Sequence, residues 1–295
     1  MTKPLSRNHG ASASGQPKGT LLLLSTCGTS IFTNQASPED RGWLTRSTNA
    51  RNLSSEDAQR FDAISSRCRS QLLQAGHPEK CRISAELNSI SAVLKRWPAQ
   101  RIQHILVHSD TEIGERATTL LQEVLEADSH LVQRVTAGGL RTDDSSSLRH
   151  ALAEISREIL EWTTADKGSG NHVIFNLTGG FKSVNAYLQA IGTLYADRCV
   201  FLFESSQQLM EIPRLPMRLD EQDEIRKNLT AFRKLHIGYL VSPQDFSGNV
   251  DSLLITIDDE VATSPWGDAA WAQARLPLMG SEILDPLSPR LKISV

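Results

Sequence analysis

The chain has 295 residues, of which 22% are charged, and a formal net charge of −3. This charge excludes a protein that coats nucleic acid through a general positive field, so an anionic ligand needs a local basic site. Hydrophobic residues make up 39% of the chain, enough for one large domain or two modest ones. The apolar runs are shorter than the roughly 18 residues of a membrane span. Four cysteines without CxxC spacing favour reduced thiols and a cytoplasmic protein.

The first predicted elements follow a polar start. Residues 1–19 are rich in Gly, Ser and Pro, without the apolar segment of a secretory signal, and we expect a disordered lead-in. Residues 20–30, "TLLLLSTCGTS", are typical of a buried parallel strand that leads into a functional loop. Residues 35–80 are polar, and within them helical spacing connects Phe61, Ile64, Cys68 and Leu72. Ser54 or Ser55 would cap this helix and Gly76 would end it.

Strands and helices then alternate along the chain. Helical patterns cover residues 84–97, 111–127, 143–165 and 182–196, and strand patterns cover residues 101–110, 130–140, 172–177, 199–205 and 208–216. The last strand, which contains Pro213 and Pro216, is expected at an antiparallel edge. This alternation predicts an α/β fold, with a Rossmann-like parallel sheet and helices on both of its faces. Ligands of such sheets bind beyond the carboxyl ends of the strands.

The composition changes after about residue 218. A charged helical pattern loses its periodicity near Gly238, residues 250–258 resemble a strand, and a short helix is expected near Pro265. We therefore predict a main domain over residues 20–218 and a small C-terminal α+β module over residues 219–295. The order of these elements resembles a winged helix.

The stretch "NLTGGFKS" combines a strand end with two glycines and a lysine. Glycines let the backbone approach a ligand, and the following helix N-terminus, together with Lys182, favours an anion. A phosphate site and an ordinary turn with a solvated lysine both remain open. Because Phe181 separates Gly180 from Lys182, the stretch is not a Walker A loop. The first strand is not followed by a G-x-G-x-x-G dinucleotide fingerprint either.

Hydroxyl side chains gather at two further strand ends, "STCGTS" at residues 25–30 and "HSDT" at residues 108–111. Such groups bind phosphate and ribose oxygens without net charge, although they also satisfy ordinary turns. A G-x-S-x-G nucleophile elbow is absent, which argues against a serine hydrolase. The eight histidines show no zinc-binding spacing, so we predict neither a metal nor another cofactor.

Four segments together resemble the CARF-domain proteins of type III CRISPR systems. They are "LLLSTCGTSIFTN" near the start, "SAEL" at residues 84–87, "HSDTEIGERAT" at residues 108–118 and "NLTGGFKSVNAYLQAIG" at residues 176–192. The resemblance covers roughly residues 20–218 and is nearest to the subgroup of stand-alone ring nucleases. The long segment between the first strand and "SAEL" has no counterpart in this pattern.

The resemblance implies a symmetric homodimer that binds a cyclic oligoadenylate, most often cyclic tetra-adenylate, across its twofold axis. It also implies metal-independent cleavage, in which a ribose 2′-hydroxyl attacks the neighbouring phosphate and leaves a 2′,3′-cyclic phosphate. Lys182 would hold the phosphate, and Ser30, or Thr29 beside it, would align the ribose. The other implied ligand-binding residues are Thr26, Gly28, Ser109, Asp110, Thr111, Asn176, Thr178, Gly179, Gly180 and Phe181. The resemblance implies neither a membrane nor a long nucleic acid as a partner.

Two further interpretations stay open at the level of the sequence. The tail "LDPLSPRLK" resembles the segment that precedes a RelE-type ribonuclease in fused relatives. The chain would then be a CARF sensor of a longer effector, or of a transcriptional regulator, with weak cleavage or none. The third interpretation is an unrelated Rossmann-like nucleotide-binding protein.

Overall fold

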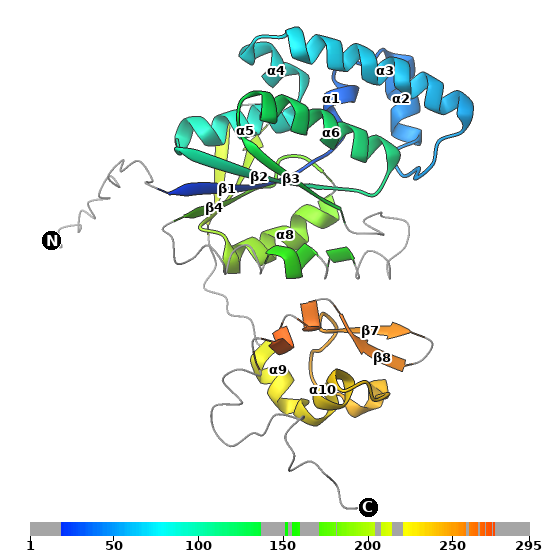
Figure 1. The fold of residues 1–295 in the computed structure, drawn as a ribbon, viewed down its shortest axis with the longest axis vertical. Helices are drawn as coiled ribbons and strands as arrows, with labels where there is room; N and C mark the ends of the chain where they lie inside the picture. Colours follow the sequence, from blue (N-terminus) through cyan, green and yellow to red (C-terminus); the bar gives the residue numbers. More distant parts are fainter. Residues whose placement is uncertain are drawn as a thin grey trace, which may run out of the picture.

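A six-stranded sheet forms the centre of the protein in a computed structural model (Figure 1). The structure describes residues 19–136, 151–152, 155–159, 171–180, 182–203, 208–213, 221–257, 260–264, 266–268, 270–272 and 274. The strands are β1 (Thr20–Thr26), β2 (Arg101–His108), β3 (Leu131–Thr136), β4 (His172–Asn176), β5 (Arg198–Phe203) and β6 (Gln208–Ile212). Their order in the sheet is β3-β2-β1-β4-β5-β6. Among the strand pairs of this sheet that the structure describes, β5–β6 is antiparallel and the others are parallel.

This topology confirms the predicted Rossmann-like α/β fold and the antiparallel edge strand. The chain builds the sheet outward from β1 in one direction through β2 and β3, and then in the other direction through β4 and β5. The order of strands therefore reverses between β1 and β4, which is where open α/β sheets bind their ligands.

Helices cover both faces of the sheet, as the alternating pattern predicted. One face packs against α5 (Ala85–Arg96) and α6 (Glu112–Ala127), whose apolar stripes meet Leu21, Leu23 and Leu106. The other face packs against α8 (Lys182–Tyr195) and the helical residues 155–159. Figure 1 shows α5 and α6 above the sheet and α8 below it. Because β1 alternates its side chains between the two clusters, it is buried on both faces.

The segment between β1 and β2 contains more helix than the sequence indicated. The predicted helix is α3 (Ser55–Gln74), which Ser54 caps by accepting the amide of Asp57. The four side chains at helical spacing, Phe61, Ile64, Cys68 and Leu72, are buried as expected. The prediction that Gly76 ends α3 is wrong. Gly76 is instead the N-cap of the next helix, α4 (His77–Ile83). The structure adds α1 (Ser30–Thr33) and α2 (Pro38–Arg46), both of which pack on the α5–α6 side of the sheet.

Residues 221–274 have a small core of their own around Phe232, Leu253 and Trp271. The elements are α9 (Glu221–Lys227), α10 (Leu229–His236), a 3-10 turn η1 (Pro243–Asp245), and the hairpin of β7 (Leu254–Ile257) and β8 (Glu260–Thr263). The single helix expected here is divided at Asn228, whose side chain bonds the backbone of Ser247 in both directions. The strand β8 was not predicted.

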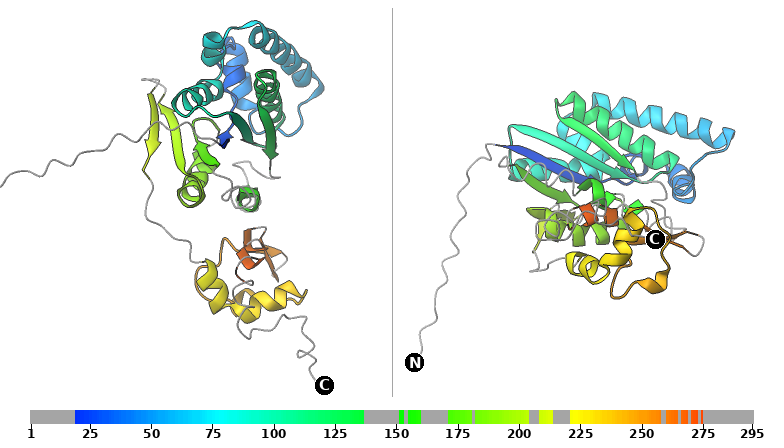
Figure 2. Two further views of the ribbon diagram at one scale, coloured as in Figure 1. Left: turned by 60° about the vertical axis from the view of Figure 1, so that its left-hand side comes forward. Right: turned by 60° about the horizontal axis from the view of Figure 1, so that its bottom comes forward.

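The structure places this small unit below α8 in Figure 1, and Figure 2 shows it from two further sides. Tyr195, the last residue of α8, contacts Trp266 edge to face, with ring centroids 6.1 Å apart. The domain boundaries, the disordered lead-in and the winged-helix resemblance remain predictions. Residues 1–18, most of the helical pattern over residues 143–165, Phe181 and Pro265 lie outside the described residues. None of the described helices has the length and apolar character of a bilayer span.

Candidate functional site

The three strand ends singled out in the sequence are neighbours in the sheet. β1 lies between β2 and β4, and the amide of Cys27 donates to the carbonyl of Val107 at 2.8 Å. The loops after β1 and β4 touch, because a Cβ atom on Gly28 would lie 3.0 Å from the amide nitrogen of Gly180. The stretches "STCGTS", "HSDT" and "NLTGG" therefore lie beside one another at one edge of the sheet.

A buried carboxylate, that of Glu86, lies where these loops meet. Glu86 is in the first turn of α5 and is 1% exposed. One oxygen accepts the amide of Gly28 at 2.9 Å. The other accepts the hydroxyl of Ser84 at 2.7 Å and the hydroxyl of Ser30. The motif "SAEL" does not by itself mark Glu86 as a site residue, because an acidic residue after a hydroxyl N-cap is the ordinary pattern of a helix start.

The hydrogen bonds around Ser30 fix the direction in which its hydroxyl hydrogen points. The hydroxyl donates its only hydrogen to Glu86 and accepts the amide of Ala85 at 2.9 Å. A hydroxyl has one hydrogen and two lone pairs, so one lone pair of Ser30 remains. Ser30 is partly exposed. A ligand can therefore donate a hydrogen bond to Ser30, for example from a hydroxyl of its own. A phosphate oxygen cannot bond Ser30, because it only accepts.

Several predicted ligand-binding hydroxyls have partners inside the protein. Thr26 is buried and donates to the carbonyl of Gly179 at 2.7 Å. Thr178 donates to Asn176 at 2.6 Å and accepts the amide of Leu202 at 2.9 Å. The side chain of Asn176 is itself buried. These groups give the loop after β4 its shape, and their direct contact with a ligand remains a prediction.

The "HSDT" strand end forms the start of α6. The hydroxyls of Ser109 and Thr111 are 2.8 Å apart, and Thr111 caps the helix by accepting the amide of Gly114 at 3.2 Å. Both are buried, whereas Asp110 is partly exposed and pairs with Arg51 from the segment after β1. This ion pair ties the segment between β1 and β2 to the edge of the sheet that carries the site.

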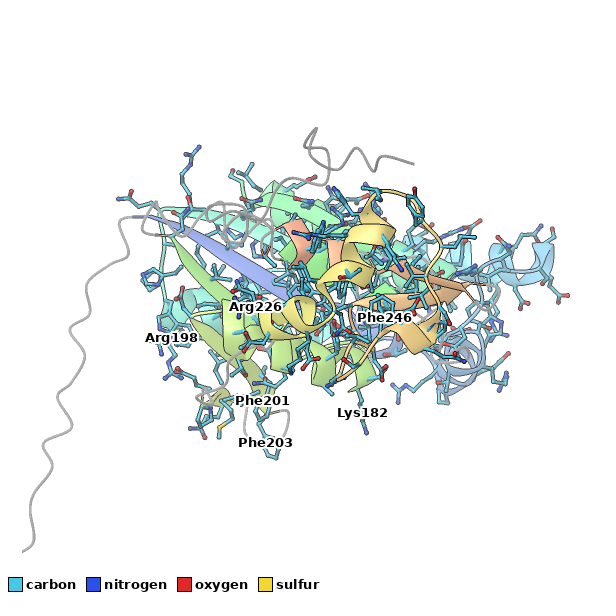
Figure 3. The ribbon with its side chains drawn as sticks, turned by 90° about the horizontal axis from the view of Figure 1, so that it is seen from below. Lys182, Arg198, Phe201, Phe203, Arg226 and Phe246 are labelled. Atoms are coloured by element: carbon cyan, nitrogen blue, oxygen red, sulfur yellow. The ribbon has the colours of Figure 1, made fainter. Side chains whose placement is uncertain are left out.

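Lys182 is the first residue of α8, and its side chain is exposed. Figure 3 shows it projecting away from the ribbon. The neighbouring Gly180 is also exposed and has a φ of +78°, a conformation that glycine adopts without strain. A helix N-terminus with an ammonium beside it favours a bound anion.

Two residues that the sequence analysis missed hold the loop after β4. The amide group of Asn185 donates to the carbonyls of Gly179, at 2.8 Å, and Leu177, at 3.3 Å. On the other side, a Cβ atom on Gly179 would lie 2.4 Å from Oε1 of Glu86. Glycine is required at this position by the close approach of the carboxylate. Only the contacts in three dimensions reveal either role.

The site also contains the thiol of Cys27, which is 5% exposed. Burial, together with the nearby charge of Glu86, raises the pKa of Cys27 well above its ordinary value. The thiol is therefore a neutral packing group near neutral pH. Among the described residues, no group of three or more His, Cys, Asp or Glu side chains is arranged to hold a metal ion.

The fold and the site define a Rossmann-like α/β protein with a glycine-containing, basic loop at the reversal of strand order. Residues 81–215 match a family model described as CRISPR-associated protein (Cas_APE2256). The matched segment contains Glu86, the "HSDT" strand end and Lys182. This match supports an association with CRISPR systems. Among curated proteins, none matches the chain.

Proposed function

We propose that the protein is a CARF-domain ring nuclease that binds a cyclic oligoadenylate, with cyclic tetra-adenylate as the expected ligand, and cleaves it without a metal. The supporting observation is the direction of the Ser30 hydroxyl hydrogen, which is donated to Glu86 inside the protein. This hydroxyl can accept a hydrogen bond from a ligand but has no hydrogen left to donate. A ribose 2′-hydroxyl is such a donor, and in this reaction it is the nucleophile.

The remaining groups suit a reaction whose nucleophile belongs to the substrate. The protein then has to align the 2′-hydroxyl with the phosphate and stabilise the charge that develops on it. Lys182 and the start of α8 supply positive charge. Attack by the 2′-oxygen forms the 2′,3′-cyclic phosphate, and the 5′-oxygen leaves.

An exposed aromatic ring supports a nucleobase as part of the ligand. Phe203 is 53% exposed and ends β5, next to Leu202, whose amide bonds Thr178 in the loop after β4. Figure 3 shows Phe203 and Lys182 projecting from the same edge of the ribbon. Adenine stacks on such rings. A ring of four adenylates also suits a homodimer, because both have twofold symmetry.

The test is incubation of the pure protein with labelled cyclic tetra-adenylate in excess EDTA. Linear products that end in a 2′,3′-cyclic phosphate, formed by the wild type and lost in Lys182→Ala, support the proposal. A protein that binds neither cyclic tetra- nor hexa-adenylate would overturn it. Lys95→Ala is the matched control, because Lys95 is an exposed lysine in the last turn of α5.

The contact between Tyr195 and Trp266 favours a second candidate, a CARF sensor. One helix, α8, has Lys182 at its first residue and the contact with the small C-terminal unit at its last. A ligand at its start can thereby influence that unit, as in a RelE-type ribonuclease fusion or a transcriptional regulator. Tight binding of cyclic tetra-adenylate without products in the same assay would identify the sensor.

A further inference from the structure

Glu86 has a location and a set of partners that a structural role alone does not explain. Its side chain is almost completely buried, and its described hydrogen-bond partners are neutral: one amide and two hydroxyls. Burying a carboxylate without a cation is costly. A glutamine would fill the same space and could bond the same groups. A costly charge beside a candidate ligand group is typical of a functional site.

The hydrogen bonds form a directed chain from the surface to this carboxylate. Ser30 is partly exposed, and its hydrogen points inward to Oε2 of Glu86. The amide of Ala85 occupies one lone pair of the Ser30 oxygen, at 2.9 Å. The other lone pair is available to a group outside the protein. A proton from a group outside the protein can therefore move to the oxygen of Ser30 while the hydrogen of Ser30 moves to Glu86, in one concerted step.

We propose that Glu86 is the proton acceptor for the attacking 2′-hydroxyl and acts through Ser30. This inference rests on the proposed ring nuclease function and adds a base to it. As the 2′-oxygen bonds to phosphorus, its proton moves to the oxygen of Ser30, and the hydrogen of Ser30 moves to Glu86. The bond from phosphorus to the 5′-oxygen breaks, and this oxygen takes a proton from a water molecule. The resulting hydroxide removes the proton from Glu86, which restores the carboxylate.

Glu86 is thus a positioning residue as well as a proton acceptor, because it also determines which way the Ser30 hydroxyl points. In Glu86→Gln the amide group would donate to Ser30 and Ser84. Both lone pairs of Ser30 would then be occupied, and its hydrogen would point outward. The variant keeps the shape of the site, but the Ser30 hydroxyl would donate a hydrogen bond to the ribose where in the wild type it accepts one.

The test compares cleavage and binding of cyclic tetra-adenylate by the wild type, Glu86→Gln, Ser30→Ala and the double variant. We expect Glu86→Gln to bind the probe but to cleave it roughly 100- to 10,000-fold more slowly, the usual contribution of a general base. Because the two residues act as one unit, the double variant should be no slower than the slower single variant. Glu115→Gln, an exposed acid in the first turn of α6, is the matched control and should cleave normally.

The pH dependence separates a proton acceptor from a purely structural residue. With a working base, the rate under saturating probe rises with pH and then reaches a plateau. In Glu86→Gln and in Ser30→Ala, the residual rate should instead continue to rise about tenfold per pH unit, as hydroxide becomes the base. Burial raises the pKa of the neighbouring Cys27 thiol well above its ordinary value, so this thiol stays neutral near neutral pH and does not act as the base there.

Each other outcome overturns a distinct statement. If the wild type cleaves and Glu86→Gln cleaves at the same rate, the role of Glu86 is wrong and the ring nuclease stands. The same holds if Ser30→Ala keeps the wild-type plateau, a result that does not depend on whether Glu86→Gln folds. If the wild type itself forms no product, both the ring nuclease and the role of Glu86 are wrong.

Discussion

The amide of Gly28 donates a hydrogen bond of 2.9 Å to Oε1 of Glu86, a residue 58 positions later in the sequence. This bond joins the loop after β1 to the first turn of α5. The same carboxylate also leaves no space beside Gly179. One buried side chain therefore determines the positions of two loops that carry candidate ligand groups, and several predictions depend on it.

Replacing Gly179 by alanine should destabilise the protein. A Cβ atom there would lie 2.4 Å from Glu86 and 2.7 Å from the carbonyl oxygen of Thr26, so one of the loops has to move. We expect a loss of about 1–3 kcal/mol, as for other overpacked sites, measured by denaturant unfolding. Gly42→Ala is the control, because Gly42 lies inside α2 and a Cβ atom there would make only an ordinary contact, 3.5 Å from the Arg46 side chain. That variant should be more stable, by up to about 1 kcal/mol; equal behaviour of the two would contradict the packing.

The two replacements of Glu86 should differ in stability. Glu86→Gln keeps the shape of the side chain and removes a buried charge, so we expect its free energy of unfolding to stay within about 1 kcal/mol of the wild type. Glu86→Ala leaves the amide of Gly28 and the hydroxyl of Ser84 without their acceptor and should lose about 2–4 kcal/mol. Thermal and denaturant unfolding of both variants provide the measurement. A glutamine variant as unstable as the alanine variant would show that the charge itself stabilises the fold.

Lys182→Ala should lower activity without lowering stability. The side chain is exposed at the first residue of α8, where a positive charge is unfavourable to the helix dipole. Its removal should therefore leave the melting temperature unchanged or slightly higher. Cleavage of cyclic tetra-adenylate should fall about 100- to 1,000-fold, as for the loss of one group that stabilises the transition state. A clear fall in melting temperature would mean that Lys182 supports the fold instead.

Stability should decrease as the pH falls below about 6.5, the ordinary pKa of histidine. Burial and the neighbouring ring of His130 lower the pKa of His104 to about 3, and burial also lowers the pKa of His108 and of His130. The unfolded chain then binds protons that the folded protein does not bind, so unfolding becomes more favourable in acid. Each such group contributes up to about 1.4 kcal/mol per pH unit.

The check is denaturant unfolding at about pH 7 and about pH 5, in the wild type and in His104→Phe. The aromatic replacement removes one of the three groups, so the difference in free energy between the two pH values should shrink without vanishing. An unchanged difference in His104→Phe would show that His104 does not contribute to the pH dependence.

The sequence was sufficient for the elements whose signal is local. Leu21 to Leu24 form a continuous apolar run, and Ile113, Ala117 and Leu120 recur at helical spacing. Patterns of this kind reflect which face of an element is buried. The Rossmann-like fold and the antiparallel edge strand followed from them. The short helices α1, α2 and α4 were missed because their stability comes from packing more than from a repeated apolar pattern.

The amino-acid sequence by itself determined where strands end in glycines, hydroxyls and a lysine, since these are properties of neighbouring residues. Only the tertiary structure decided what these groups do. Thr26 and Ser109 are buried and bonded within the protein, whereas Ser30 is partly exposed and donates its hydrogen to Glu86. Glu86 lies 56 positions from Ser30 along the chain. A hydrogen bond between such distant residues has no local signature, because it exists only once the sheet has brought β1 and α5 together.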